Sequence, residues 1–497
     1  MRFYTILIFC LVFQSLIAQD NFVTDLATPD LDLTKVERVN LSNQGLEELP
    51  AALFDCINLV ELNISDNQLL ALPEQIQKLK KLQKLNINNN PIEDLPKKEM
   101  PKMQALQEIL ASNSLKGNVW NTALGIFAKL PNLRKLDLSN NEATGLSSNI
   151  KKWKNLEYLE LQNNNLRNLP SNLEDLTKLS YLGIANNPDL DFDDATQQLA
   201  TIKTLREVDL SNNQLIEIPK AVMDIRFMTK LDVSNNKITA LPSRMTQLIR
   251  LRQFNASNNQ IEQISEAFSL LENLISLQLS DNKIKTLPAG MGDMRELEVL
   301  EMDNNLLLDL PESLRKCKEL QKLAVANCPI EKITFNVGNL TNLTYLDLSN
   351  VPVTDFEVKE LTTLTQLKYL SLAGYTAENW NEILAVVPSL TQLEIFKLSN
   401  TATKVLPAEF IQLHQLKELH VAACTVLDLS QLIEQLGAEN MKVEILDCSD
   451  LELEQLPANI KDLNVKTLLL RNHKLEAASL VQLQEDLPNL TIITNEQ

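Results

Sequence analysis

Histidine is the side chain best suited to acid–base chemistry near neutral pH, and the chain has three: His414, His420 and His473. The repeat register described below places them on a helix-side segment, on a strand and at the turn that follows a strand. No serine or cysteine falls beside any of them with a carboxylate behind it, as nucleophilic catalysis requires. A glycine-rich phosphate loop is also absent from the sequence. We therefore predict no catalytic residue and no enzymatic activity.

Four aspartates form a D-x-D-x-D-D cluster at Asp189, Asp191, Asp193 and Asp194. Calcium prefers such oxygen ligands, but the EF-hand pattern fails. Asp194 stands where that loop needs glycine, and Ala200 stands where it needs glutamate. Asp193 or Asp194 is instead expected to cap a following helix. We predict no metal site and no cofactor.

Five cysteines follow the N-terminal apolar segment: Cys56, Cys317, Cys328, Cys424 and Cys448. None belongs to a close C-x-x-C pair, which disfavours zinc and redox motifs. Their odd number and wide spacing argue against a disulfide framework. Buried free thiols are the expectation.

Tyrosines show the clearest functional pattern. Tyr158, Tyr181, Tyr345 and Tyr369 all occupy the third position of a recurring L-x-x-L-x-L segment, where the side chain should point outward from a strand. The first two lie on adjacent strands, as do the last two, so each pair should be about 5 Å apart. Small residues follow Tyr181 and Tyr369 at the next outward positions and predict shallow pockets there. Exposed tyrosine is typical of binding surfaces; the alternative is cross-strand stacking that only stabilises the sheet.

The elements that position these tyrosines come from one repeat, L-x-x-L-x-L-x-x-N-x-L followed by x-x-L-P-x-x-I-x-x-L. Nineteen units begin at Val36, Leu59, Leu82, Leu106, Leu133, Leu156, Leu179, Leu205, Met228, Leu251, Leu274, Leu297, Leu320, Leu343, Leu367, Leu393, Leu416, Val443 and Val465, with a partial unit at Leu490. Alternation in L-x-L predicts a short strand with one buried face. The proline blocks further strand pairing, and the apolar spacing after it predicts a short helix or 3₁₀ turn.

This motif resembles that of the leucine-rich repeat family. The 23-residue L-P-x-x-I-x-x-L-x-x-L version is similar to the repeats of Ras-binding leucine-rich scaffolds and of plant disease-resistance proteins. The resemblance and the pattern together predict an α/β fold: a right-handed leucine-rich repeat solenoid, or horseshoe, with a concave parallel sheet and short convex helices or 3₁₀ turns. The resemblance also implies a binding module.

An asparagine recurs where the chain leaves each strand. Its amide both donates and accepts, so it can satisfy backbone groups of neighbouring coils. The predicted ladder consists of Asn67, Asn90, Asn141, Asn164, Asn187, Asn213, Asn236, Asn259, Asn282 and Asn305. Beyond Asn305 other residue types occupy this position and the repeat lengths become uneven. We therefore divide the array into a regular block, 36–319, and an irregular block, 320–497.

The two ends of the chain have their own signals. Residues 1–18 read as a signal peptide, because Arg2 precedes an apolar run that is too short to span a bilayer. Residues 19–35 are expected to form an N-terminal cap, and a helix near 479–487 with the Leu490 strand should close the array. Four longer units predict extra helices at 119–130, 191–202, 380–390 and 430–440.

Charge limits the partners. The chain has 46 basic and 65 acidic residues, a net charge of −19, which disfavours nucleic acid. We expect an extracytoplasmic, bacterial protein, with no transmembrane segment, that binds an unidentified protein or peptide through its concave face. One alternative is an envelope adhesin or structural protein that binds glycans or itself. Another, if the signal peptide is misread, is a cytoplasmic signalling scaffold.

Overall fold

The computed structural model describes residues 22–333, 336–353, 358–376, 380–438 and 441–494. The expected signal peptide, 1–18, lies outside these residues. By contacts the chain divides into two compact units. One comprises the described residues up to Gln214 with Pro219–Asp232, and the other comprises Leu215–Ile218 with the residues from Val233 onward. The expected division at residue 319 rests on repeat regularity and stays a prediction.

Within the described residues, 20 strands form one parallel sheet in which each strand pairs with its neighbour in the repeat order. They are β1 (Arg38–Asn40), β2 (Glu61–Asn63), β3 (Lys84–Asn86), β4 (Glu108–Leu110), β5 (Lys135–Asp137), β6 (Tyr158–Glu160), β7 (Tyr181–Gly183), β8 (Glu207–Asp209), β9 (Lys230–Asp232), β10 (Gln253–Asn255), β11 (Ser276–Gln278), β12 (Val299–Glu301), β14 (Lys322–Ala324), β16 (Tyr345–Asp347), β17 (Tyr369–Ser371), β18 (Ile395–Lys397), β19 (Glu418–His420), β20 (Ile445–Asp447), β21 (Thr467–Leu469) and β22 (Thr491–Ile493). A separate pair joins β13 (Asp309–Leu310) to β15 (Lys332–Ile333). The repeat thus specifies one strand per coil.

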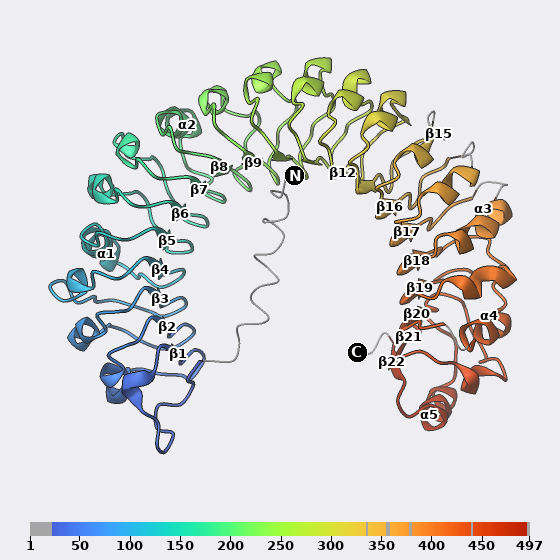
Figure 1. The fold of residues 1–497 in the computed structure, drawn as a ribbon, viewed down its shortest axis with the longest axis horizontal. Coiled ribbons are helices and arrows are strands. Elements are labelled where there is room, and N and C mark those ends of the chain that lie inside the picture. The colour runs from blue at the N-terminus through green and yellow to red at the C-terminus, as the bar shows by residue number, and fades with distance from the viewer. Residues whose placement is uncertain (1–21, 334–335, 354–357, 377–379, 439–440, 495–497) are drawn as a thin grey trace, which may run out of the picture. The chain divides into compact units, whose positions relative to one another are not determined.

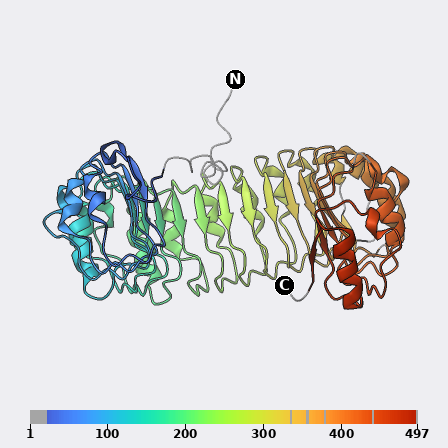
Figure 2. The same cartoon turned by 90° about the horizontal axis from the view of Figure 1, so that it is seen from below.

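Each strand is three residues long because only the L-x-L core of the motif alternates. In every strand of this sheet except β22 the central residue is buried and its neighbours point outward: Leu62 is 0% exposed between two partly exposed residues. Equivalent residues face each other one coil apart, as Glu61 faces Lys84. Figure 2 shows neighbouring strands running in the same direction. At the end of the array Thr467 faces Thr491, so the last unit begins one residue before the start expected at Leu490.

Short 3₁₀ helices form the side opposite the strands in most repeats (Figure 1). The L-P step precedes many of them; Pro73, for example, stands directly before η4 (Glu74–Lys78), whose Ile76 is buried. The others are η2 (Leu33–Lys35), η3 (Ala51–Asp55), η5 (Met100–Lys102), η6 (Ser148–Lys152), η7 (Leu173–Asp175), η8 (Lys220–Asp224), η9 (Ser243–Gln247), η10 (Glu266–Leu270), η11 (Ala289–Asp293), η12 (Glu312–Lys316), η13 (Val337–Asn339), η14 (Val358–Thr363), η15 (Val387–Ser389), η16 (Ala408–Gln412) and η17 (Ile460–Asp462).

The four longer units contain α-helices, as their apolar spacing predicts. These are α1 (Val119–Phe127), α2 (Phe192–Ala200), α3 (Trp380–Val386) and α4 (Leu429–Leu436); α5 (Ala477–Asp486) precedes β22. One expectation was wrong in detail: the N-cap of α2 is Asp191, which accepts from the Asp194 N–H at 3.1 Å. Asp193 and Asp194 lie in the first turn, where their charge favours the helix dipole. In the described parts of the chain, no helix is both long and apolar enough to cross a membrane.

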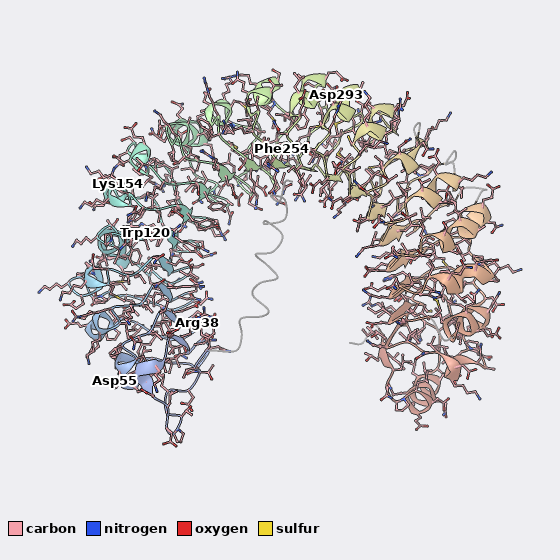
Figure 3. All side chains as sticks on the ribbon, viewed as in Figure 1. Arg38, Asp55, Trp120, Lys154, Phe254 and Asp293 are labelled. Carbon is pink, nitrogen blue, oxygen red and sulfur yellow. The ribbon has the colours of Figure 1, made fainter. Side chains whose placement is uncertain are left out.

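The core of each coil is mostly aliphatic and lies between the strand and the helical segment. Phe254 on β10, labelled in Figure 3, is 1% exposed. Its ring contacts that of Phe268 on η10, with centroids 6.0 Å apart. Trp120 on α1 donates its indole N–H to the Gly145 carbonyl at 3.0 Å. Neighbouring coils therefore bury one another, and no coil has a complete core alone.

Candidate functional site

The first tyrosine pair, Tyr158 and Tyr181, lies on the outward face of β6 and β7. Strand pairing places the two residues directly opposite each other. Their rings stack in parallel with centroids 4.0 Å apart and an interplanar angle of 7°. The Lys135 ammonium on β5 lies 5.0 Å from the centroid of the Tyr158 ring, a cation–π distance. The sequence register therefore brings this pair together, as predicted from adjacent third positions.

Glu160 lies beneath the first pair and holds it from one side. One of its carboxylate oxygens accepts a short hydrogen bond from the Tyr158 hydroxyl. Glu160 is only 8% exposed, and Oε2 has no hydrogen-bond partner among the described residues. Burial raises the pKa of the Glu160 carboxyl, although the hydroxyls of Tyr158 and Tyr181 lower it. A buried carboxylate with one unsatisfied oxygen is costly, so its charge needs a compensating group nearby.

Gly183 makes room for that carboxylate. A Cβ at this position would overlap Glu160 Oε2 and would lie 2.9 Å from the Tyr181 hydroxyl. The shallow pocket expected beside Tyr181 over Gly183 is therefore wrong, because Glu160 fills the space. A small cavity of about 40 Å³ lies next to Tyr181 instead, lined by Tyr181, Glu207, Val208, Asp209, Lys230 and Asp232.

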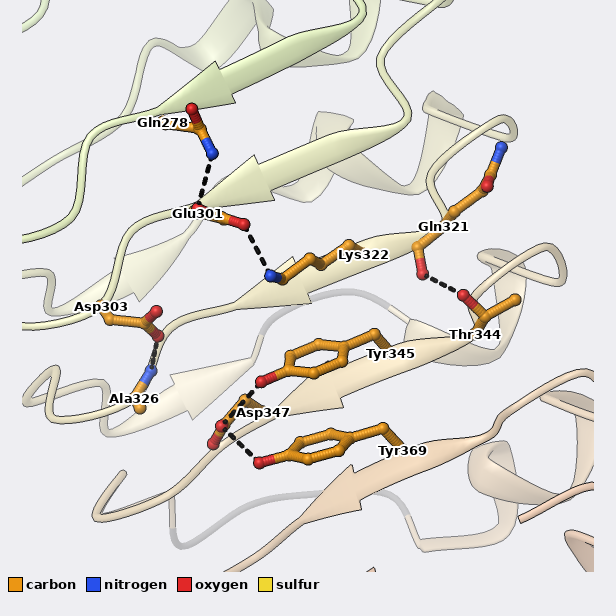
Figure 4. A network of polar contacts seen from close by, with 10 residues as sticks. All are labelled: Gln278, Glu301, Asp303, Gln321, Lys322, Ala326, Thr344, Tyr345, Asp347 and Tyr369. Carbon is orange, nitrogen blue, oxygen red and sulfur yellow. Dashed lines mark hydrogen bonds and ion pairs between the residues drawn. The ribbon is translucent and has the colours of Figure 1, made fainter. Parts of the chain in front are cut away.

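The second tyrosine pair, Tyr345 and Tyr369, repeats the arrangement on β16 and β17. The rings stack with centroids 4.0 Å apart and an interplanar angle of 6°. Both hydroxyls point to Asp347 Oδ2, at 3.4 Å and 3.2 Å (Figure 4). Lys322 on β14 covers Tyr345 at 4.6 Å, and Lys397 on β18 covers Tyr369 at 5.4 Å. An ammonium group therefore covers the outer ring face on each side of this pair.

The pocket expected beside Tyr369 is also wrong. Ser371, the small residue at the next outward position, is 0% exposed and shares a short hydroxyl–hydroxyl hydrogen bond with Ser349. Ser349 in turn donates to Asp347 at 2.6 Å. Hydrogen-bonded side chains thus occupy the space.

Burial is the main reason that the pKa values of Tyr158, Tyr181 and Tyr345 are raised, so their phenols stay neutral throughout the physiological range.

Asp303 lies near the second pair on the turn after β12. Its carboxylate accepts the Ala326 N–H at 2.7 Å (Figure 4). Burial, with the nearby charges of Asp347 and Glu301, raises its pKa to about 6. Lys322 forms an ion pair with Glu301 at 2.6 Å, which partly balances this acidic neighbourhood.

The ten asparagines named above are buried and bond between coils. Asn282 is representative: its amide donates to Ala256 and Leu279 carbonyls at 3.0 Å each, and its oxygen accepts the Ile261 N–H at 2.9 Å. Ser114 takes the same position in its unit and donates to the Ile87 carbonyl at 2.7 Å. Further along, Cys328 donates to the Met302 carbonyl at 3.3 Å. These side chains anchor the turn and do not reach the outward face.

A second asparagine row was missed by sequence reasoning. The residue preceding the ladder position has a left-handed backbone, with φ of 58°, 55°, 56° and 55° at Asp281, Asn304, Asn327 and Asn350. Their side chains bond in series at 2.8, 2.7 and 2.7 Å. In the regular block the signal was the doubled Asn-Asn or Asp-Asn, as at Asp281 and Asn304, since asparagine and aspartate tolerate positive φ.

Part of this row borders a larger hollow. Its volume is about 510 Å³, and its walls are polar: Asn89, Ser112, Asn113, Asn140, Glu142 and Asn163. It lies among the left-handed turns that follow strands β3 to β6, in the first of the two compact units. It is therefore separate from the tyrosine pairs.

His420 was assigned to an outward strand position, and β19 places it there. Its Nδ1 lies 3.2 Å from Asp447 Oδ2, and its Nε2 lies 3.3 Å from Glu418 Oε2. Burial raises the pKa of Asp447, but hydrogen bonds from His420 and Ser449 outweigh burial and leave it lowered. The imidazole thus bridges carboxylates on two strands.

The remaining chemically reactive groups are buried or scattered. The five cysteines are all free and buried. Burial raises the pKa of Cys317 and of Cys328 to about 11, which keeps both thiols protonated and unreactive. Within the described residues, no group of three or more His, Cys, Asp or Glu side chains has the arrangement to hold a metal ion.

Comparison with known proteins agrees with this geometry. The Leucine rich repeat family model matches residues 34–92, 131–188 and 228–284. No curated protein matches the sequence. Among solved structures, a leucine-rich repeat protein of Leptospira interrogans is 24% identical over 95% of this chain and 99% of its own, with a TM-score of 0.57. A TDR receptor is 21% identical over 92% and 83%, with a TM-score of 0.50. The matched segments show leucine-rich repeats over these three stretches, and the 20-stranded parallel sheet has the fold of a leucine-rich repeat solenoid.

Proposed function

We propose that this chain is an exported binding protein that holds a protein or peptide partner on the outward face of its sheet. Leucine-rich repeat solenoids are commonly used for protein and peptide binding, because stacked coils present a long continuous surface. The observation that carries the proposal is the pairing of Tyr158 with Tyr181 and of Tyr345 with Tyr369. Each pair presents two rigid, parallel, partly exposed rings on the strand side.

Rigidity favours binding over a purely stabilising role. A tyrosine has few torsions to freeze on binding, and here the torsions are already fixed by stacking and by Glu160 or Asp347. The ring edges and hydroxyls present both apolar surface and hydrogen-bonding groups. Such preorganised aromatic residues are typical hot spots of protein interfaces.

Export rests on the N-terminal segment. The positive Arg2, the apolar run and the polar turn after Ala18 have the order of a signal peptide. Sequencing the N-terminus of the native protein tests this: a start near Gln19 or Asp20 supports export. An intact Met1 would favour the cytoplasmic scaffold instead.

Partner capture tests the binding role. Purified protein would be incubated with envelope and culture-medium extract beside the double variant Tyr158→Ala/Tyr181→Ala. The matched control is Tyr158→Phe/Tyr181→Phe, which keeps the stacked rings and removes the hydroxyls. We expect a partner on the parent and the phenylalanine variant, and a loss of at least tenfold on the alanine variant. Equal capture by all three folded proteins would mean that the pair only stabilises the sheet.

A glycan-binding adhesin is the second candidate, and the asparagine-lined hollow favours it. Asn89, Asn113, Asn140 and Asn163 surround about 510 Å³ of open space with amide donors and acceptors, which suit sugar hydroxyls. Glycan-array binding that is lost in Asn113→Ala, with Tyr158→Ala/Tyr181→Ala unchanged, would support this function.

A further inference from the structure

The two tyrosine pairs differ at one side. In the second pair, Lys322 and Lys397 cover the two outer ring faces at 4.6 and 5.4 Å. In the first pair, Lys135 covers Tyr158 at 5.0 Å. Among the described residues, no ammonium or guanidinium group covers the far face of Tyr181. The cavity of about 40 Å³ lies beside Tyr181 instead.

Strand register explains the difference. Lys397 is the third residue of β18, the strand that follows the second pair. Asp209 is the third residue of β8, the strand that follows the first pair. A carboxylate thus occupies the position from which the second pair receives its closing lysine. The second pair therefore shows the lysine–ring contact that the first pair lacks at Tyr181.

The walls of the cavity are predominantly acidic. Glu207, Asp209 and Asp232 line it, with Lys230 as the one basic lining residue. Asp209 and Asp232 face each other across adjacent strands. Burial and the charge of Asp232 raise the pKa of Asp209, although Ser211 and Lys230 oppose this. The residues that line the cavity therefore carry more negative than positive charge.

Glu160 adds a further carboxylate on the other side of Gly183 from Asp209. It is 8% exposed, and its unpartnered Oε2 extends over Gly183, the residue between Glu160 and Asp209 in the sheet. The Asp209 charge also raises the pKa of Glu160. Asp209 lines the cavity, and a cation there would lower the cost of burying its carboxylate, because charges interact strongly where water is partly excluded.

We propose that the cavity beside Tyr181 binds a lysine side chain of the partner, with its ammonium group over the Tyr181 ring and paired with Asp209 and Glu207. The partner segment is a lysine-containing peptide or protein surface. Its ammonium takes the place that Lys397 takes against Tyr369. The inference rests on the proposed function, because it assigns a partner chemistry to the same outward face.

A defined peptide tests this without the natural partner. The probe is a terminally blocked, fluorescent peptide with lysines at alternate positions among glycine and serine, and its control replaces each lysine by norleucine. Binding is measured by fluorescence anisotropy at two salt concentrations. We expect saturable, salt-sensitive binding of the lysine peptide and none of the norleucine peptide.

Three variants locate the binding. Asp209→Lys supplies an internal cation and should weaken binding at least tenfold. Glu174→Lys makes the same charge change on η7, at an exposed position on the helix side, and should bind like the parent. Asp209→Asn keeps an acceptor for the Ser211 N–H and should weaken binding severalfold with little effect on folding. The reciprocal change, Lys397→Asp, should raise the number of bound peptides by opening the second pair.

Each outcome decides the inference. Equal weakening by Asp209→Lys and Glu174→Lys would mean that net charge alone attracts the peptide, and the inference would fail. It would also fail if no variant of the folded protein, parent included, bound the lysine peptide. The proposed function stands or falls separately, because partner capture depends on Tyr158 and Tyr181, which Asp209→Lys leaves unchanged.

Discussion

The carboxylate of Glu160 occupies the space that Gly183 leaves by having no side chain. The two residues face each other on β6 and β7. This contact places a buried carboxylate under the hydroxyls of the first tyrosine pair and thereby fixes the tilt of both rings.

Substitution of Gly183 by alanine tests this contact. The added Cβ would overlap Glu160 Oε2, so the carboxylate and Tyr181 must shift. We expect the free energy of unfolding to fall by about 1–3 kcal/mol, as for other overpacked sites, measured by urea denaturation. Gly145→Ala is the control, because the nearest atom to its Cβ is 4.0 Å away. Equal effects of the two substitutions would contradict the account.

Asp303 should make stability depend on pH. Its folded-state pKa of about 6 exceeds the ordinary value of 3.8, so the folded protein binds this proton more tightly than the unfolded chain. The contribution is therefore present below pH 4 and is lost as pH rises through about 6. Asp303→Asn keeps an acceptor for Ala326 and should raise stability at pH 7 by on the order of 1 kcal/mol, a value reduced for partial exposure.

Denaturation at pH 4 and at pH 7 measures the effect of Asp303. The difference between Asp303→Asn and the parent should shrink at the lower pH. Glu262→Gln, at an exposed position, controls for the loss of one negative charge. A variant no more stable than the parent at pH 7 would disprove the assignment.

The buried asparagines should contribute strongly to stability. Asn282→Leu removes two hydrogen bonds that join coils, to Ala256 and Ile261, and one to Leu279 within its own coil, and it leaves buried backbone groups unpaired. We expect a loss of about 3 kcal/mol in the free energy of unfolding. Gln260→Leu, the same type of change at a nearby exposed position, should alter it by less than about 0.5 kcal/mol. A loss of similar size in both variants would contradict the stabilising role assigned to the buried asparagines.

The irregular block should open before the regular block on heating. Val351 and Leu451 stand at ladder positions in residues 320–497, and their side chains cannot bond to neighbouring coils. Hydrogen exchange followed by mass spectrometry should give faster exchange in β14 and the later strands than in β2 to β12. Uniform protection along the array would contradict this prediction.

The strand register was predictable from the sequence because it depends on spacing alone. Leu182, for example, must be buried at its position, and this orients Tyr181 outward beside Tyr158. The stacked pairs follow from that rule. The α-helices follow from the extra apolar residues of the longer units.

Side-chain packing on the outward face was not predictable in the same way. Glu160 occupies a position that alternation makes outward, yet it is 8% exposed because it folds over Gly183. The cavity beyond Tyr181 depends on the rotamers of Glu207 and Asp209, which no periodicity specifies. The left-handed turns at residues such as Asn304 were readable from the doubled polar residues, since few other residue types accept that backbone.

The outer asparagine row has a consequence for how such a chain can change length. Asn327 bonds to Asn304, its counterpart one coil away, and Asn350 bonds to Asn327. The coils that carry Asp281, Asn304, Asn327 and Asn350 thus present the same joint to their neighbours. Within this stretch, gene duplication or deletion of one whole unit would leave the remaining joints matched, so the array could be lengthened or shortened here without redesigning the neighbouring coils.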